Sequence, residues 1–202
     1  MGEDAAEKVV LDHDDLRKAL VRIAHEIVEK NSSDSSSPDE AIAFVGIHTR
    51  GAVISKRLHA LVGELSGSEV PIGDLDISFY RDDVERRDPQ RAPIVHASHL
   101  DFALEGKTVI LVDDVLFTGR TVRAAIEALF DYGRPARVQL AVLADRGHRE
   151  LPIRPDYVGK NLPTAPGERV NVRLEETDGR DEVAIVTAEA AAATAGGGEE
   201  EG

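Results

Sequence analysis

Cysteine is absent from the 202-residue chain, and so are long apolar runs and a basic, apolar leader. Without cysteine the protein forms no disulfide, holds no iron–sulfur cluster or cysteine-bound zinc, and uses no cysteine nucleophile. No uninterrupted apolar stretch approaches the roughly 18 residues that a membrane-spanning helix requires. The first ten residues, MGEDAAEKVV, lack the features of an export signal. We therefore expect a cytoplasmic protein that makes no membrane contact.

Negative charge is concentrated at the two ends of the chain. Residues 1–40 hold 5 basic and 11 acidic side chains, residues 168–202 hold 3 and 10, and residues 41–167 hold 16 and 17. These counts give charges of −6, −7 and −1, which make up the net charge of −14. The acidic balance argues against indiscriminate nucleic-acid binding, although a local basic face is compatible with it. Such a balance is typical of a highly soluble surface or of a salt-rich cytoplasm, and the sequence leaves both open.

The length suits one domain, which we place at residues 1–187, followed by a low-complexity acidic tail at 188–202 for which we expect disorder. Apolar periodicity predicts helices at 12–30, at 52–65 and from 121 to a stop at Gly133, and strands at 41–47, 70–79, 107–112, 137–144, 170–174 and 183–186. The last two strands flank Asp178-Gly179, which indicates a hairpin. The repeated order of strand, turn and helix predicts an α/β fold with a parallel central sheet.

Two polar stretches between these elements have the composition of surface loops. Residues 31–38, NSSDSSSP, form a serine-rich connector. Residues 80–93, YRDDVERRDPQRAP, are charged, contain two prolines and have no apolar face. Such a stretch is typical of a mobile loop, and in a ligand-binding protein it is the obvious lid.

The chain is organised around residues 107–132, where an apolar strand leads through two aspartates and a polar loop into a helix. Residues 118–121, TGRT, supply two hydroxyls, a permissive glycine and a cation at the helix N-terminus, where N–H groups and the helix dipole favour a phosphate. The carboxylates of Asp113 and Asp114 are suited to vicinal ribose hydroxyls or to Mg²⁺. For an Asp-Asp pair alone, a solvated turn with a helix cap is the alternative.

Two other polar segments also follow predicted strands. Residues 48–51, HTRG, open a helix, so they offer a second anion site to which Arg50 adds a guanidinium. Residues 145–152, DRGHRELP, come directly after the strand at 137–144. Parallel strands end at a common edge, and open α/β sheets bind ligands there. We therefore expect these segments to meet the central motif at one edge of the sheet.

Residues 109–121, VILVDDVLFTGRT, resemble the phosphoribosyl pyrophosphate (PRPP) motif of type I phosphoribosyltransferases. Four further segments, RIAHEIVEKN, GIHTRG, DISFYRDD and GRPARVQLAVLADRGHRELPIRPDYVGKNLPT, resemble with it the PyrR family over about residues 9–187. This family joins uracil phosphoribosyltransferase activity to the regulation of pyrimidine operons. The resemblance implies the type I phosphoribosyltransferase fold, with a mostly parallel central sheet flanked by helices, a small hood and a C-terminal hairpin.

The resemblance also implies a reaction, in which PRPP and uracil give UMP and pyrophosphate with Mg²⁺ as cofactor. Asp113 and Asp114 match catalytic and metal-binding positions, and Arg81 matches a catalytic residue on the lid. The positions that match the PRPP site are Thr49, Arg50, Asp113, Asp114, Val115, Leu116, Phe117, Thr118, Gly119, Arg120 and Thr121. Arg146 and Val170 match positions on the side of the base.

The second function that the resemblance implies is UMP-promoted binding of a hairpin in the leader mRNA of pyrimidine genes, which controls transcription by attenuation. The family forms the basic RNA-binding face across a dimer, so we expect a homodimer or a higher homo-oligomer. The matching candidates are Arg22, His25, Lys30, His148, Arg149, Arg154 and Lys160. A slow or non-catalytic RNA-binding sensor of UMP or PRPP is one alternative, and a purine phosphoribosyltransferase is another.

Overall fold

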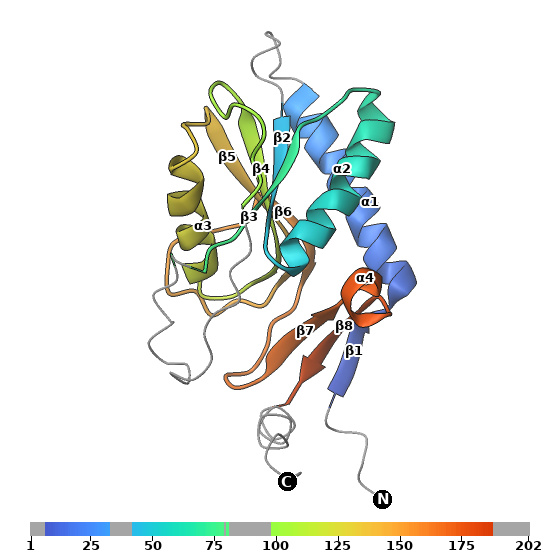
Figure 1. The fold of residues 1–202 in the computed structure, drawn as a ribbon. Coiled ribbons are helices and arrows are strands. Elements are labelled where there is room, and N and C mark those ends of the chain that lie inside the picture. The colour runs from blue at the N-terminus through green and yellow to red at the C-terminus, as the bar shows by residue number, and fades with distance from the viewer. Residues whose placement is uncertain (1–6, 33–41, 79, 81–97, 188–202) are drawn as a thin grey trace, which may run out of the picture.

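The computed structural model describes residues 7–32, 42–78, 80 and 98–187. These residues form a five-stranded parallel sheet of order β3-β2-β4-β5-β6 and a three-stranded antiparallel sheet of order β1-β8-β7 (Figure 1). The strands of the larger sheet are β2 (Ile42–Ile47), β3 (Ile72–Leu75), β4 (Thr108–Leu116), β5 (Arg137–Asp145) and β6 (Tyr157–Asn161). Those of the smaller sheet are β1 (Glu7–Leu11), β7 (Arg169–Arg173) and β8 (Glu182–Val186). The predicted α/β fold, parallel central sheet and C-terminal hairpin are thus confirmed.

Helices cover both faces of the parallel sheet (Figure 1). The helices are α1 (His13–Ser32), α2 (Arg50–Ser66), α3 (Arg120–Phe130) and the single turn α4 (Glu175–Asp178). Phe44 and Ile110 belong to the core cluster beneath α1 and α2, whereas their neighbours Val45 and Leu111 belong to the cluster beneath α3. Because both faces are buried, the central strands contain uninterrupted apolar runs, such as Val109–Val112 of β4 and Leu140–Ala144 of β5, and do not alternate there.

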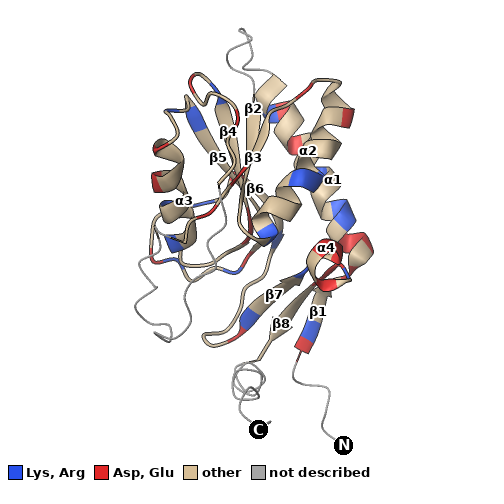
Figure 2. Cartoon of the chain, in the orientation of Figure 1, with Lys and Arg blue, Asp and Glu red and all other residues tan. Residues whose placement is uncertain are grey.

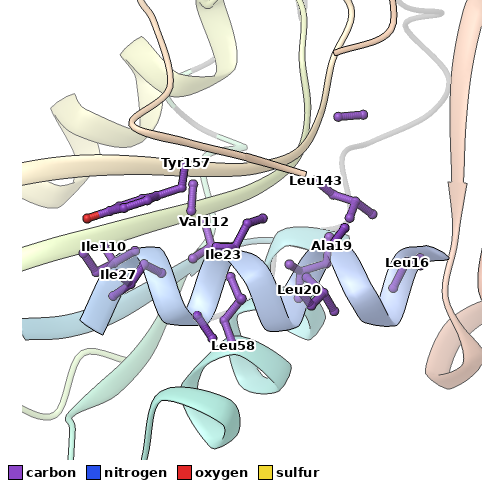
Figure 3. Close-up of a cluster of buried hydrophobic side chains, with 14 of the residues drawn as sticks. Leu16, Ala19, Leu20, Ile23, Ile27, Leu58, Ile110, Val112, Leu143 and Tyr157 are labelled. Carbon is purple, nitrogen blue, oxygen red and sulfur yellow. The ribbon is translucent and has the colours of Figure 1, made fainter. Parts of the chain in front are cut away.

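The contact of α1 with the sheet shows why its sequence forms a helix. Leu16, Leu20, Ile23 and Ile27 recur at intervals of three and four residues and are at most 3% exposed. They belong to one buried cluster with Leu58 of α2 and with side chains of the sheet (Figure 3). Burial of each such side chain stabilises the fold by about 1.5–3 kcal/mol. At the start of the helix, Asp12 Oδ1 accepts the Asp15 N–H at 2.9 Å and caps the first turn.

Two of the predicted strands differ in length from the prediction by more than one residue. We expected a strand through residue 79, but β3 ends at Leu75. The reason is local, because Asp76 Oδ1 accepts hydrogen bonds from the N–H and the hydroxyl of Ser78, at 2.7 and 2.5 Å, and turns the chain. In contrast, β4 continues to Leu116, since its pairing with β5 extends that far. Asp113 and Asp114 therefore lie within a strand and not after it.

The prediction missed β1 and β6, two five-residue strands at the edges of their sheets. Residues 33–38 of the serine-rich connector, residues 81–93 of the charged stretch and the acidic tail at 188–202 lie outside the described residues. None of the helices in the described part of the chain is long and apolar enough to cross a membrane.

Candidate active site at the carboxyl edge of the parallel sheet

The two predicted anion-binding segments meet in one cavity at the carboxyl ends of β2 and β4. Its volume is about 220 Å³. The residues that line it are His48, Thr49, Arg50, Ile77, Asp113, Asp114, Val115 and Thr121. The cavity thus combines a loop that follows β2 with the end of β4 and the first turn of α3, as the strand order predicts.

The first turn of α3 provides the phosphate-binding geometry. Gly119 precedes the helix with φ 93°, a left-handed conformation that glycine adopts without strain. The Arg120 N–H donates to Thr118 Oγ1 at 3.3 Å, so the threonine hydroxyl is held over the turn. The first N–H groups of a helix have no acceptor within the helix, and they carry the positive end of its dipole. This turn can therefore cradle a phosphate.

The two aspartates at the end of β4 differ in exposure. Asp113 is buried, 6% exposed, whereas Asp114 is partly exposed in the cavity. Asp113 Oδ1 accepts the Asp114 N–H at 2.9 Å, and Asp114 Oδ1 accepts the Val115 N–H at 2.8 Å. One oxygen of each carboxylate is thus fixed by the backbone. Both residues line the cavity, where their carboxylates can accept hydrogen bonds from vicinal hydroxyls.

The same two carboxylates are the oxygen donors that Mg²⁺ would meet. No group of three or more His, Cys, Asp or Glu side chains that could hold a metal ion lies among the described residues. Mg²⁺ is commonly held by one or two carboxylates together with substrate phosphates and water, so it needs no cage made only of protein ligands. Asp113 and Asp114 fit a cation that the substrate itself helps to hold.

The loop after β2 brings a histidine and an arginine to the cavity. The His48 Nε2 atom is hydrogen-bonded to the Asp74 carboxylate, and His99 Nδ1 lies 3.4 Å from the same carboxylate. Arg50 is the first residue of α2, and its Nη2 donates to Asp178 Oδ1 at 2.8 Å. The predicted candidate Arg50 thus lies at the cavity. Its guanidinium is paired with the carboxylate of Asp178, which lies in α4 between β7 and β8. Sequence analysis missed Asp74 and Asp178, because neither belongs to a local motif.

Arg146 is almost completely buried and lies next to the turn at residues 118–121, which we call the phosphate loop. Its guanidinium stacks on the Phe117 ring at 4.0 Å, donates from Nη2 to the Glu168 carbonyl at 2.6 Å, and donates from Nε to Thr164 Oγ1 at 3.3 Å. Burial lowers the pKa of Arg146 most, and the nearby Arg169 lowers it further. The stacking on Phe117 and the hydrogen bonds to Thr164 and Glu168 fix the orientation of the guanidinium.

A second cavity of about 320 Å³ lies between this edge and the smaller sheet. The residues that line it are Arg50, Asp114, Val170, Asn171, Val172, Arg173 and Asp178. Val170, a predicted base-side residue, therefore lies in a cavity that shares Arg50 and Asp114 with the first one. Arg146, the other base-side candidate, lines neither cavity in the described residues.

Residues 145–153 stabilise the phosphate loop through hydrogen bonds to the backbone carbonyl group of Thr118 and to that of the preceding Phe117. The N–H groups of Glu150 and Leu151 both donate to the Thr118 carbonyl at 3.0 Å. Arg149 donates to the Phe117 carbonyl at 2.9 Å, to the Ile153 carbonyl at 2.9 Å and to Asp145 at 2.5 Å. Arg149, an RNA-binding candidate, thus directs its guanidinium into the protein. Its position indicates support of the loop, and an RNA contact stays a prediction.

Three other RNA-binding candidates line the seam between α1 and β6. Arg22 donates to the carbonyls of Val158 and Gly159 at 2.8 and 2.7 Å, Lys30 Nζ lies 2.7 Å from Asp156, and Lys160 Nζ donates to the Val10 carbonyl at 2.9 Å. All three side chains are exposed while they make these contacts. They form one basic seam.

The remaining candidates are less connected to that seam. His25 and Arg154 are exposed, on α1 and on the segment before β6. His148 also is exposed, and its ring contacts the carbonyl of Thr164 at 2.6 Å and the edge of Phe117. Arg81, the predicted catalytic residue of the lid, lies outside the described residues.

Comparison with known proteins first identifies the class. A family model described as the phosphoribosyl transferase domain matches residues 9–177. A structure of hypoxanthine phosphoribosyltransferase from Trypanosoma cruzi in complex with the product IMP is similar with a TM-score of 0.70 and 18% identity, over 96% of this chain and 98% of that one. Another, of HGPRT-ase from Leishmania tarentolae in complex with GMP, has a TM-score of 0.67 and 13% identity, over 91% and 98%. The chain therefore has the type I phosphoribosyltransferase fold.

Relatives of higher identity narrow the class. The bifunctional protein PyrR of Chloroflexus aurantiacus is 56% identical over 180 residues, which cover 89% of this chain and 95% of that protein. The bifunctional protein PyrR of Deinococcus radiodurans is 55% identical over 181 residues, 90% and 95% of the two chains. That of Listeria monocytogenes serotype 4b is 52% identical over 179 residues, 88% and 95%. The chain belongs to the PyrR family of phosphoribosyltransferases, which confirms the resemblance noted in the sequence.

Proposed function

We propose that this protein transfers phosphoribose from PRPP to uracil, giving UMP and pyrophosphate, and that it also regulates pyrimidine genes by UMP-dependent binding of their leader mRNA. The observation that carries the enzymatic proposal is the convergence of two anion-binding segments and two carboxylates on one cavity. A phosphate, a diol and a pyrophosphate are the three parts of PRPP, and each has a matching set of groups at this edge. Membership of a family of bifunctional proteins supports the regulatory proposal.

The chemistry requires charge stabilisation and positioning more than a nucleophile. Uracil N1 forms a bond to C1′ of the ribose and releases its proton to solvent, while the bond from C1′ to pyrophosphate breaks and its electron pair leaves with the pyrophosphate. Positive charge develops on the ribose and negative charge on the leaving group, so preorganised donors and carboxylates lower the barrier. Bound Mg²⁺ would neutralise the pyrophosphate oxygens.

Each part of PRPP is assigned to residues of the cavity. The turn at Thr118–Thr121 holds the 5′-phosphate, and Asp113 with Asp114 accepts hydrogen bonds from the ribose hydroxyls and holds Mg²⁺. Thr49 and Arg50 receive the pyrophosphate. The base enters from the smaller sheet, where Val170 lies.

The assignment of the carboxylates leads to a direct test. We expect Asp113→Asn and Asp114→Asn each to lower the rate of UMP formation by roughly 10- to 100-fold, because each change weakens a charge-assisted hydrogen bond in the transition state. UMP formation from uracil, PRPP and Mg²⁺ is measured beside circular dichroism, which reports whether the variants fold. Unchanged rates in both variants would remove these residues from the reaction.

The acceptor base is tested in the same assay. We expect uracil to be used in preference to hypoxanthine, guanine and orotate. A better rate with a purine would make the protein a purine phosphoribosyltransferase. The likeness to the hypoxanthine enzymes does not predict that result, because at 18% identity it shows the fold alone. Leader-RNA binding without turnover of any base would favour the slow or non-catalytic regulator.

A further inference from the structure

One face of α2 is directed at the acidic connection between β7 and β8. Arg50 and Arg57 are seven residues apart, which is two helical turns, so both lie on that face. Arg50 reaches Asp178, and Arg57 reaches both Glu176 and Asp181. The acidic connection, residues 174–181, is thus bound to α2 at two points. Figure 2 shows the acidic residues gathered on α4.

Arg57 fixes the acidic connection firmly. Its guanidinium makes two hydrogen bonds to Glu176, at 2.9 and 2.5 Å, and two to Asp181, at 2.8 and 2.7 Å. Paired contacts of this kind restrict orientation as well as distance. The Asp181 side chain is only 6% exposed, so this end of the connection is anchored in a partly dry environment.

Asp178 is fixed independently of Arg50. Its Oδ2 accepts the Leu174 N–H at 2.9 Å and the Thr177 hydroxyl at 2.7 Å, while its Oδ1 is left for Arg50. Removal of Arg50 would therefore leave the carboxylate in place. The carboxylate is the stationary partner of this ion pair.

Arg50 is held much less tightly. Only Nη2 donates to Asp178, and Nε is buried without an acceptor among the described residues. The side chain is 38% exposed and lines both cavities. A buried N–H of a guanidinium that lacks an acceptor is unfavourable, so another arrangement of this side chain with a second acceptor is favoured when one is supplied.

We propose that Asp178 is a positioning residue that holds Arg50 at the edge of the site and gives it up to the pyrophosphate group of the donor. The inference rests on the proposed function of this cavity and deepens it. Pyrophosphate carries several negative charges and can accept two parallel hydrogen bonds from a guanidinium, whereas Asp178 accepts one. Pyrophosphate therefore displaces Asp178, and the carboxylate lowers donor affinity by the strength of the pair that must be broken.

The test removes the charge of Asp178 while keeping its shape. Asp178→Asn retains an oxygen acceptor for the Leu174 N–H, and it no longer competes as a carboxylate for Arg50. We expect inorganic pyrophosphate with Mg²⁺ to bind roughly three- to tenfold more tightly in titration calorimetry. The KM for PRPP should fall by the same factor, while kcat does not rise.

The matched control is Glu175→Gln, which removes one negative charge from the same helical turn. Glu175 is exposed, so its substitution should leave pyrophosphate affinity within about twofold of the parent. In an Arg50→Ala background, Asp178→Asn should have no effect on affinity, because the two residues then no longer act on each other.

Unchanged or weaker pyrophosphate binding by a folded Asp178→Asn protein would overturn the inference. If circular dichroism shows that this variant is unfolded, Asp178→Ser replaces it, since serine can still cap the Leu174 N–H. The calorimetric measurement does not depend on uracil. A parent protein that binds pyrophosphate but converts no base would therefore contradict the proposed function and leave the role of Asp178 to be decided by the affinities.

Discussion

At the scale of single residues, two glycines of α2 have opposite surroundings. A Cβ atom on Gly51 would lie 2.5 Å from the Val112 carbonyl oxygen and 3.0 Å from Asp113 Cα. A Cβ atom on Gly63 would meet only the Ser68 carbonyl oxygen, at 3.8 Å. Gly51 thus lets the loop after β2 approach the backbone of β4 next to the carboxylates, whereas Gly63 serves no such contact.

The same substitution should therefore have opposite effects at the two positions. We expect Gly51→Ala to lower the free energy of unfolding by about 1–3 kcal/mol, because the methyl group forces two backbones apart, and to raise the KM for PRPP. We expect Gly63→Ala to raise the free energy of unfolding by about 0.5–1 kcal/mol, because alanine is the better helix former. Urea unfolding of both variants provides the measurement. Equal effects at the two positions would show that the approach of α2 to β4 is not tight.

Single residues also show how far the sequence alone could predict the site. Asp113, Asp114 and the turn at 118–121 lie in one continuous motif, so their meeting could be predicted from a strand followed by a helix. The contact of Arg50 with Asp178 joins positions 128 residues apart. Nothing in the local pattern of either segment indicates that contact, because it depends on how the smaller sheet lies against α2.

At the scale of elements, strands that are buried on both faces could be predicted, whereas two of the edge strands, β1 and β6, could not. The apolar runs of β2, β4 and β5 lie at the centre of the sheet, where their buried side chains belong to the core clusters on its two faces. By contrast, β1 has the burial pattern of an exposed strand that becomes buried only at Leu11, and β6 is buried only at Tyr157. Their conformation is set by pairing with another strand, β8 in the case of β1 and β5 in the case of β6. The local sequence of β1 and β6 does not indicate this pairing.

The acidic connection is the element whose stability should depend most on pH. Hydrogen bonds from Arg57 are the largest effect on the pKa of Glu176 and lower it. For Asp181, burial is the largest effect and opposes the change, but hydrogen bonds from Arg57 and from the Glu175 N–H still leave its pKa lowered. A carboxyl group with a lowered pKa in the folded state stabilises the fold above its unfolded pKa, and that stabilisation is lost as pH falls through the folded value.

We accordingly expect Arg57→Gln to lower the free energy of unfolding by about 2 kcal/mol at pH 7, a figure that allows for solvent screening at Glu176. The difference from the parent should be fully present above the ordinary carboxyl pKa of about 4 and should shrink as pH falls below it, through the lowered folded pKa values of the two carboxyl groups. Urea unfolding across this pH range measures it. The control is Arg123→Gln, which removes an exposed helical ion pair with Glu127 and should cost at most about 0.5 kcal/mol at any pH. A difference that does not shrink at all as the pH is lowered would mean that Arg57 acts through packing and not through its charge.

At the scale of the whole molecule, a net charge of −14 must be reconciled with binding of RNA. The basic seam of Arg22, Lys30 and Lys160 is the place where the described residues offer positive charge along one edge. Each of these side chains already contacts a protein acceptor, a carbonyl oxygen or a carboxylate. Few cations are therefore available to displace the counterions of an RNA backbone.

The last prediction follows from this limited supply of cations. Each phosphate neutralised by a protein cation adds roughly 0.9 to the slope of log affinity against log salt on a duplex, and about 0.7 on a single strand. We expect UMP-stimulated binding of a leader hairpin with a slope no steeper than about −2, because recognition relies on loop bases more than on phosphates.

His25→Ala should weaken this binding, since His25 lies exposed on α1 beside the seam, and Arg149→Ala should weaken it through the loop that Arg149 supports. Arg123→Gln, on α3 at the opposite face of the sheet, removes one positive charge as a control and should leave the affinity unchanged.

Hairpin affinity is measured across a salt series beside uracil turnover in the same buffers, where turnover should vary less because Mg²⁺ and backbone N–H groups bind the donor in a partly closed pocket. A steep slope would contradict the argument from charge alone, whereas absence of specific binding at every salt concentration, with turnover intact, would leave a phosphoribosyltransferase without the regulatory function.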